Sequence, residues 1–299
     1  MEEDAIEAEV KQAWRSHRDT SPSVRRINVR RLLFQAECQA KRDIAAHLSL
    51  GVDLLLEALQ VLMQLRQIQT RRAKRKLHLP NLAFWLLVDR QIGLVCSIYR
   101  LITNGLDEPA RVLGRTLLET TELSVAVLYD TTLAEGYASD EDYDANQFWV
   151  DRISRGKVTR LVKTAMMTLD ADEEMANDLL ALRRDVKQRF SGSVHSSFTS
   201  SFHSSLVVSL SSPGRLATNT LGHVSAFTPS LCAAVIHEVH FFVVFVVRSI
   251  LKRPNETVLS DVLPDEAASF MVAAVVFQNL VQKYEQRLHD VTDRILDEL

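Results

Sequence analysis

The sequence is short of the residues that end secondary-structure elements, with only 9 glycines and 7 prolines among 299 residues. A β-sandwich or β-barrel needs a turn about every 8–12 residues, and this chain lacks the residues to make that many turns. Collagen-like and proline-rich chains are excluded for the same reason. The composition therefore favours long, uninterrupted helices.

Cysteine is also scarce, and the three thiols, Cys38, Cys96 and Cys232, lie far apart in the sequence. Their spacing fits neither a zinc site nor a disulfide framework and is typical of a reduced compartment. The acidic N-terminal segment does not resemble a signal peptide. The formal net charge of −3 argues against a globally basic nucleic-acid-binding protein. We therefore predict a cytoplasmic protein.

A long uncharged apolar run is missing as well. The most apolar stretch, residues 226–251, contains His237, Glu238, His240 and Arg248. A membrane-spanning helix is indicated by about 18 or more apolar residues with few or no charges, and these polar side chains interrupt the run. We expect a buried helix here and no membrane span.

Apolar residues recur at helical spacing through most of the chain, and the few prolines mark joints between helices. The pattern predicts an all-α fold, a single bundle of about eight helices. Residues 1–79 are expected to form N-terminal helices with a basic end, and residues 80–299 the bundle core of one integrated domain. The expected helices span residues 23–70 (as one or two helices), 81–102, 109–129, 148–169, 173–190, 230–251 and 265–299, with short helical turns in an acidic connection over 131–147.

One segment departs from the helical pattern, because 11 of the 22 residues from Ser191 to Ser212 are serine. Serine side chains compete for backbone hydrogen bonds and weaken helices. We expect an irregular Ser-rich insert over residues 191–229, with short extended pieces near residues 206–210. An irregular segment between helices is a favourable place for a functional site.

The Ser-rich insert begins with two residues whose chemistry suits RNA cleavage. Arg189 ends the preceding helix and His195 follows six residues later, with Gly192 expected to break the helix so that the two side chains converge. An arginine can stabilise a pentavalent phosphate, while a histidine titrates near neutral pH and can accept the proton of the attacking 2′-hydroxyl. The segment RDIAAH supplies an alternative pair, Arg42 and His47.

An arginine followed after four to six residues by a histidine resembles the signature of the HEPN superfamily of small helical bundles. RDIAAH is similar to its stricter form, although it lies earlier in the chain than the family's motif normally does, and RFSGSVH fits the looser spacing. GRTLLET (Gly114–Thr120) followed by SGSVHSS also resembles an uncharacterised bacterial helical family, over about residues 84–251. Many HEPN proteins are dimeric ribonucleases of defence or toxin systems, with a composite site where two motifs meet. The resemblance thus implies a homodimeric ribonuclease that needs no metal or cofactor.

A chance origin of these pairs stays open. The 26 arginines and 9 histidines of the chain give about two matches at the permitted spacings by composition alone. A structural role therefore remains an alternative for each pair. Arg189 and His195 are preferred because their segment is expected to be irregular.

A charged stripe on the predicted helix 109–129 has two interpretations. Arg111, Arg115, Glu119 and Glu122 follow one face of an otherwise apolar helix, and Arg115 and Glu119 are spaced to pair. One interpretation is a buried structural salt bridge. The other is a polar cleft wall beside His195, with Arg115 and Glu119 in the catalytic site.

Two further clusters have weaker functional interpretations. In IHEVH, His237 and His240 are three residues apart, whereas zinc proteases place their histidines four apart, so we predict no metal site. A basic segment could contact RNA phosphates or form a solvated helix end, and its residues are Arg71, Arg72, Lys74, Arg75 and Lys76.

Two functions from different classes follow. The first is a HEPN-like metal-independent ribonuclease in bacterial defence or a toxin system, in which Arg189 binds phosphate and His195 transfers the proton. The alternative is a non-catalytic helical scaffold or adaptor that binds a protein or nucleic-acid partner.

Overall fold

The computed structural model describes residues 8–15, 27–72, 78–139, 145–195, 206–208, 216–218, 222–225, 227–252, 257–263 and 265–297. Nearly all of them are helical, residues 8–15 included. The named helices are α2 (Val29–His47), α3 (Ser49–Arg72), α4 (Leu79–Thr103), α5 (Asp107–Tyr129), α6 (Thr131–Ala138), α7 (Ala145–Phe148), the π-helix η1 (Trp149–Ile153), α8 (Lys157–Thr168), α9 (Glu173–Val194), α11 (Thr228–Lys252) and α12 (Ala268–Asp297). Two short strands are β1 (Leu206–Val208) and β2 (Leu216–Thr218).

The predicted all-α fold is confirmed, but the predicted number of about eight helices is not. The acidic connection contains two helices of its own, α6 and α7. The helix expected over 148–169 is divided into η1 and α8, because Arg155 and Gly156 both adopt left-handed backbone conformations, with φ of 57° and 73°. A left-handed residue cannot continue a right-handed helix, so α8 begins anew after this turn.

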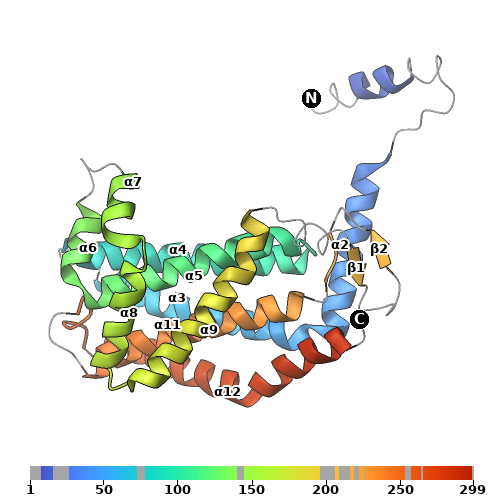
Figure 1. The fold of residues 1–299 in the computed structure, drawn as a ribbon. Coiled ribbons are helices and arrows are strands. Elements are labelled where there is room, and N and C mark those ends of the chain that lie inside the picture. The colour runs from blue at the N-terminus through green and yellow to red at the C-terminus, as the bar shows by residue number, and fades with distance from the viewer. Residues whose placement is uncertain are drawn as a thin grey trace.

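The long helices lie side by side in one bundle, from which α2 projects (Figure 1). α4 and α5 form an antiparallel hairpin whose turn contains Gly105, at φ 73°. A Cβ atom at Gly105 would lie 2.7 Å from the backbone nitrogen of His223, which donates a hydrogen bond to the Gly105 carbonyl at 2.6 Å. Glycine is therefore required by both the conformation and the close approach. This contact joins the end of the Ser-rich region to the bundle.

The core of the bundle surrounds α11. This helix packs against α3, α5 and α12, and its residues Phe242 and Val246 are fully buried. Phe270 and Phe277 of α12 and Phe84 of α4 fill the space next to it. The apolar stripe of each helix, spaced three and four residues apart, thus faces one shared core.

The Ser-rich insert begins later than predicted and is described only in part. α9 continues to Val194, so Gly192 does not break the helix as expected. β1 lies within the expected extended region and pairs antiparallel with β2, with Val207 opposite Ala217. Residues 196–205, 209–215, 219–221 and 226 of the predicted insert lie outside the described residues.

The expectation of no membrane span is wrong by length and composition. α4 and α11 are each long and apolar enough to cross a membrane, and α2 with α3 would form a third candidate bent by 94°. The prediction treated every polar side chain of residues 226–251 as an interruption, although Glu238 and Arg248 are too few to lower the apolar character of α11. The cytoplasmic assignment is overturned by the same finding. Within the bundle, 67% of the most apolar 18-residue stretch of α11 is buried, and 44% of the corresponding stretch of α4.

Candidate functional site

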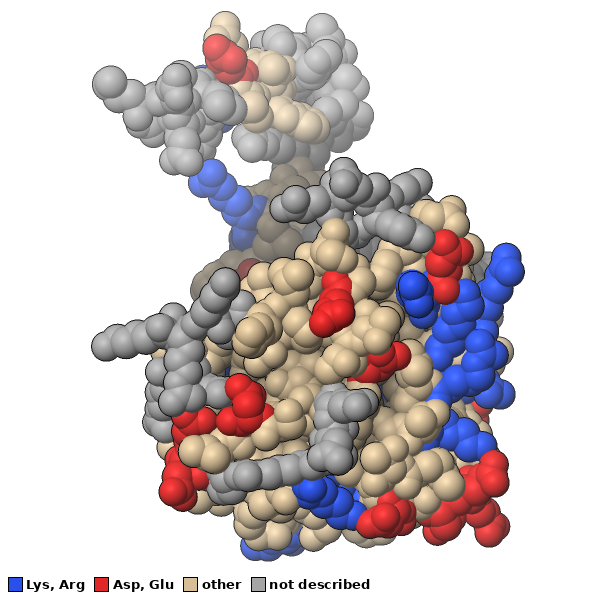
Figure 2. All heavy atoms as spheres, turned by 90° about the vertical axis from the view of Figure 1, so that its left-hand side faces the viewer, with Lys and Arg blue, Asp and Glu red and all other residues tan. Residues whose placement is uncertain are grey.

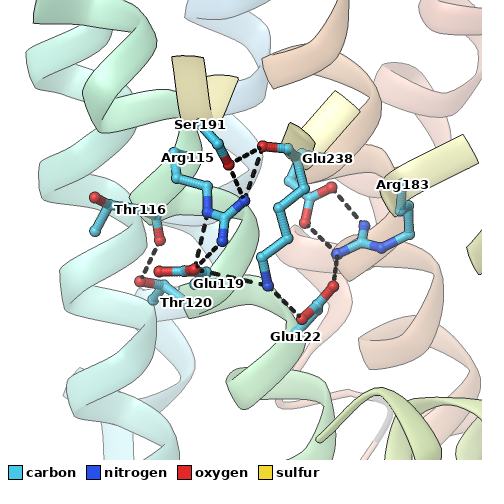
Figure 3. A network of polar contacts seen from close by, with 9 residues as sticks. Arg115, Thr116, Glu119, Thr120, Glu122, Arg183, Ser191 and Glu238 are labelled. Carbon is cyan, nitrogen blue, oxygen red and sulfur yellow. Dashed lines mark hydrogen bonds and ion pairs between the residues drawn. The ribbon is translucent and has the colours of Figure 1, made fainter. Parts of the chain in front are cut away.

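A network of charged side chains joins three helices of the bundle. Arg115, Glu119 and Glu122 of α5 point toward Arg183 and Lys187 of α9 and toward Glu238 of α11 (Figure 3). Three cations meet three carboxylates, so the network is electrically neutral. A low-dielectric interior tolerates buried charges only when they are paired in this way.

Arg115 ties α5 to the C-terminal end of α9. Its Nη2 lies 2.8 Å from Glu119 Oε1, and its Nη1 donates to the Lys187 carbonyl at 2.8 Å and to Ser191 Oγ at 2.7 Å. Both expected partners, Arg115 and Glu119, therefore form the ion pair that their spacing predicts. The additional bonds to α9 fix the last turn of that helix against α5.

The most buried part of the network is the pair between Arg183 and Glu238, which are 5% and 4% exposed. Arg183 donates two hydrogen bonds to the carboxylate, one of them from Nη2 to Oε1 at 2.7 Å, and also lies 3.8 Å from Glu122. Its guanidinium group stacks over the Phe241 ring at 4.0 Å. A two-pronged geometry of this kind is the strongest form of ion pair in proteins.

A groove of about 680 Å³ lies directly beside this buried pair. Its walls come from α9 and α11, the turn between α8 and α9 closes one end, and Glu285 of α12 lies at its edge. Most of the lining is apolar, including Met175, Leu179 and Leu182 of α9 and Phe241 and Phe245 of α11. Helical spacing explains the two walls, because residues three and four apart share a face.

The order of residues along the groove follows from the antiparallel courses of α9 and α11, which are joined by the pair of Arg183 and Glu238. Next to the end lined by Arg189 and Ser230, Phe190 and Leu231 both lie within 3.3 Å of the position of a Cβ at Gly114. At the other end, Arg248 donates to the Leu169 carbonyl at 3.0 Å. The groove thus runs lengthwise along α11 and has two distinct ends.

The preferred catalytic pair is not brought together within the chain. Arg189 and His195 are exposed, and because α9 is continuous to Val194 they differ by about 120° around its axis and by about 9 Å along it. Arg189 lines the groove, whereas His195 caps the end of α9 through its N–H bond to the Ser191 carbonyl at 3.0 Å. Their roles in catalysis remain predictions.

The alternative pair lies on α2, outside the groove. Arg42 and His47 are exposed. Asp43 and Ile44 between them are buried, and Asp43 accepts a hydrogen bond from Gln39 at 2.9 Å. The side chains of the predicted basic cluster, Arg71, Arg72, Lys74, Arg75 and Lys76, lie outside the described residues.

The end of the bundle that contains α6, α7 and α8 carries charges of both signs. A group of basic side chains on this face has acidic side chains next to it, and much of the rest is uncharged (Figure 2). A nucleic acid binds through a continuous basic surface. The described residues of this face therefore offer no broad field of one sign.

The IHEVH segment contributes side chains to the groove and to the buried ion pair. His237 and His240 line the groove, and Glu238 forms an ion pair with Arg183. Across the described ranges, no group of three or more histidine, cysteine, aspartate or glutamate side chains could hold a metal ion.

The groove and two members of the network, Arg183 and Lys187, were not predicted from the sequence. A signal was available, since these residues are four apart on a predicted helix and therefore share a face. Glu238 within the most apolar helix was a second signal, because a buried carboxylate requires a cation.

Comparison with known proteins adds no relative to these observations. No protein-family model matches the chain, and neither a curated protein nor a solved structure shows significant similarity to it.

Proposed function

We propose that this protein is a non-catalytic helical binding module and that the groove between α9 and α11 receives an apolar ligand. The observation that carries this proposal is the groove itself, with about 680 Å³ of space and a largely apolar lining. Ligand sites in proteins are typically apolar concavities of about 300–1,000 Å³ with a few polar groups. The proposal shares its non-catalytic character with the adaptor alternative, but the ligand is an apolar molecule in place of a protein or nucleic-acid partner.

The neighbouring charges support binding over catalysis. Arg115, Arg183 and Lys187 are held by partners within the chain. A catalytic cation must be able to reach the substrate, and these three are committed to holding α5, α9 and α11 together. They give the groove a fixed shape, which lowers the entropic cost of ligand binding.

The test uses an uncharged fluorescent dye, N-phenyl-1-naphthylamine, and two matched variants. Leu182 in the groove is 57% exposed and Leu86 on α4 is 53% exposed, so aspartate can replace either without entering the core. We expect the unaltered protein to bind the dye saturably at one site. Leu182→Asp should weaken binding about tenfold or more because a carboxylate resists burial, while Leu86→Asp should not change it. Absence of saturable binding, or equal weakening by both substitutions, would reject the proposal.

We also propose ribonuclease activity as a second candidate, on the strength of one observation. Arg115 holds Ser191, and the Ser191 carbonyl accepts the backbone N–H bond of His195. Arg115 thereby acts as a positioning residue for the turn that carries His195. A histidine fixed at an exposed helix end is accessible to an RNA phosphate.

The test is cleavage of single-stranded RNA in the presence of a metal chelator. Loss of a general acid or base typically lowers the rate by about 10²–10⁴-fold, which is the effect expected for His195→Ala. His78→Ala is the matched control, because His78 is also an exposed histidine at the end of a helix and belongs to neither candidate catalytic pair. If the purified protein leaves RNA intact, or if the two variants cleave equally well, this second candidate is refuted.

A further inference from the structure

The two ends of the groove differ in the cation that they offer to a ligand. Next to the turn between α8 and α9, the lining includes Met166, Leu169 and Phe245, and the cation at this end, Arg248, donates to the Leu169 carbonyl at 3.0 Å. At the opposite end, Arg189 and Ser230 bring polar atoms to the lining. An extended molecule in the groove would therefore meet an arginine bound to a backbone carbonyl at one end and, at the other, an arginine for which the described residues provide no ion-pair partner.

Arg189 is the cation that the groove offers to a ligand. It is exposed, and it forms no ion pair with any residue in the described ranges. The other two arginines of the lining are engaged, since Arg183 binds Glu238 and Arg248 donates to the Leu169 carbonyl.

The groove also contains one carboxylate that has no arginine partner, and it lies away from this end. Glu285 of α12 reaches the groove next to His240, with which it interacts electrostatically. His240 is ten residues from Ser230 along α11, a separation of about 15 Å. The polar end at Ser230 is therefore positively charged through Arg189.

The length of the groove matches an acyl chain. From Ala233 to Phe245, both of which line the groove, α11 rises about 18 Å. The hydrocarbon core of a bilayer is about 30 Å thick, so one leaflet of acyl chains occupies about 15 Å. Arginine is the side chain best suited to bind a carboxylate, because its N–H groups match the two oxygens.

We infer that the ligand is a long-chain fatty carboxylate whose head group pairs with Arg189 and whose chain extends toward Phe245. This inference rests on the proposed binding function and adds the chemical class of the ligand. Charge complementarity at Arg189 and the largely apolar lining between the two ends carry it.

The experiment measures displacement of the dye by oleate and by oleyl alcohol, which has the same chain and no charge. Arg189→Gln removes the cation, and Arg184→Gln is the matched control on an exposed neighbour that does not line the groove. We expect Arg189→Gln to weaken oleate binding about tenfold, as for loss of a hydrogen bond to a charged group. Oleyl alcohol should bind both variants and the unaltered protein equally.

The outcomes separate this inference from the proposed function. If oleate fails to displace bound dye, or if Arg189→Gln and Arg184→Gln bind oleate equally, the fatty carboxylate is refuted while the groove remains a binding site. If the dye itself does not bind saturably, the proposed function fails and the inference fails with it.

Discussion

The charge balance beside the groove predicts that removing one charge of a buried ion pair destabilises the fold more than removing both. Arg183 and Glu238 are both buried and joined by two hydrogen bonds. In Glu238→Gln, Arg183 keeps only Glu122, at 3.8 Å, and Glu122 is already shared with Lys187 at 3.2 Å. The variant therefore leaves one buried positive charge without a partner.

The magnitude follows from the cost of burying an unpaired charge. Breaking a buried ion pair by removing one partner typically costs about 3–5 kcal/mol, and the same loss of stability is expected for Glu238→Gln. The double variant Arg183→Met with Glu238→Leu removes one charge of each sign and leaves the remaining network neutral. Apolar replacement of a whole buried pair is often neutral or stabilising, so its stability should lie within about 1 kcal/mol of the unaltered protein or above it.

Urea denaturation followed by circular dichroism measures both free energies of unfolding. The matched control is Glu173→Gln, which breaks the exposed pair with Lys163 and should shift the unfolding midpoint far less than Glu238→Gln does. The reasoning is refuted if Glu238→Gln is as stable as the unaltered protein, or if the double variant is less stable than Glu238→Gln alone.

Three further predictions concern neighbouring contacts. Tyr129→Phe removes the hydrogen bond to the Phe245 carbonyl at 3.1 Å and should lower the free energy of unfolding by about 1 kcal/mol in urea denaturation. Because burial raises the pKa of Tyr129, the phenol of the unaltered protein should ionise at higher pH than an exposed tyrosine in an ultraviolet titration. The hydrogen bond from Lys163 lowers the pKa of Glu173, so Lys163→Met should raise this pKa toward its ordinary value, as measured by NMR. In the unaltered protein, the stabilisation by this pair should be complete above the ordinary pKa of a glutamate and vanish as the pH falls through the lowered pKa. Gly114→Ala places a Cβ 3.0 Å from a ring atom of Phe190 in α9 and should cost about 1–3 kcal/mol, and an unchanged melting temperature would contradict this.

Helix positions could be predicted where the apolar periodicity ended near a proline, asparagine or glycine. The predicted helices 81–102 and 230–251 correspond to α4 and α11 within two residues at each end. The helix expected over 148–169 was interrupted instead, because Arg155 and Gly156 both take left-handed conformations. Gly156 was a signal for this turn that the prediction did not use, whereas an arginine gives no such signal.

The candidate site was harder to predict because it depends on contacts between helices. Gly192 was expected to end a helix, yet α9 continues past it to Val194. Ser191, which lowers helix propensity in isolation, here donates to the Lys187 carbonyl and accepts from Arg115. Arg115 lies 76 residues away in the chain, so local propensity carried no information about this bond.

Hydropathy alone cannot separate a helix buried in a bundle from one that crosses a bilayer, because both lose contact with water. The position of polar groups is more informative, since each must find a partner in either environment. On α11, Glu238 is bound by Arg183 of α9, and Ser249 Oγ donates to Thr257 at 3.0 Å. The single acid inside the most apolar helix thus required a cation on a neighbouring helix, and the residue that supplies it fixes the register of α9 against α11. That register places Arg189 at one end of the groove and Phe245 near the other.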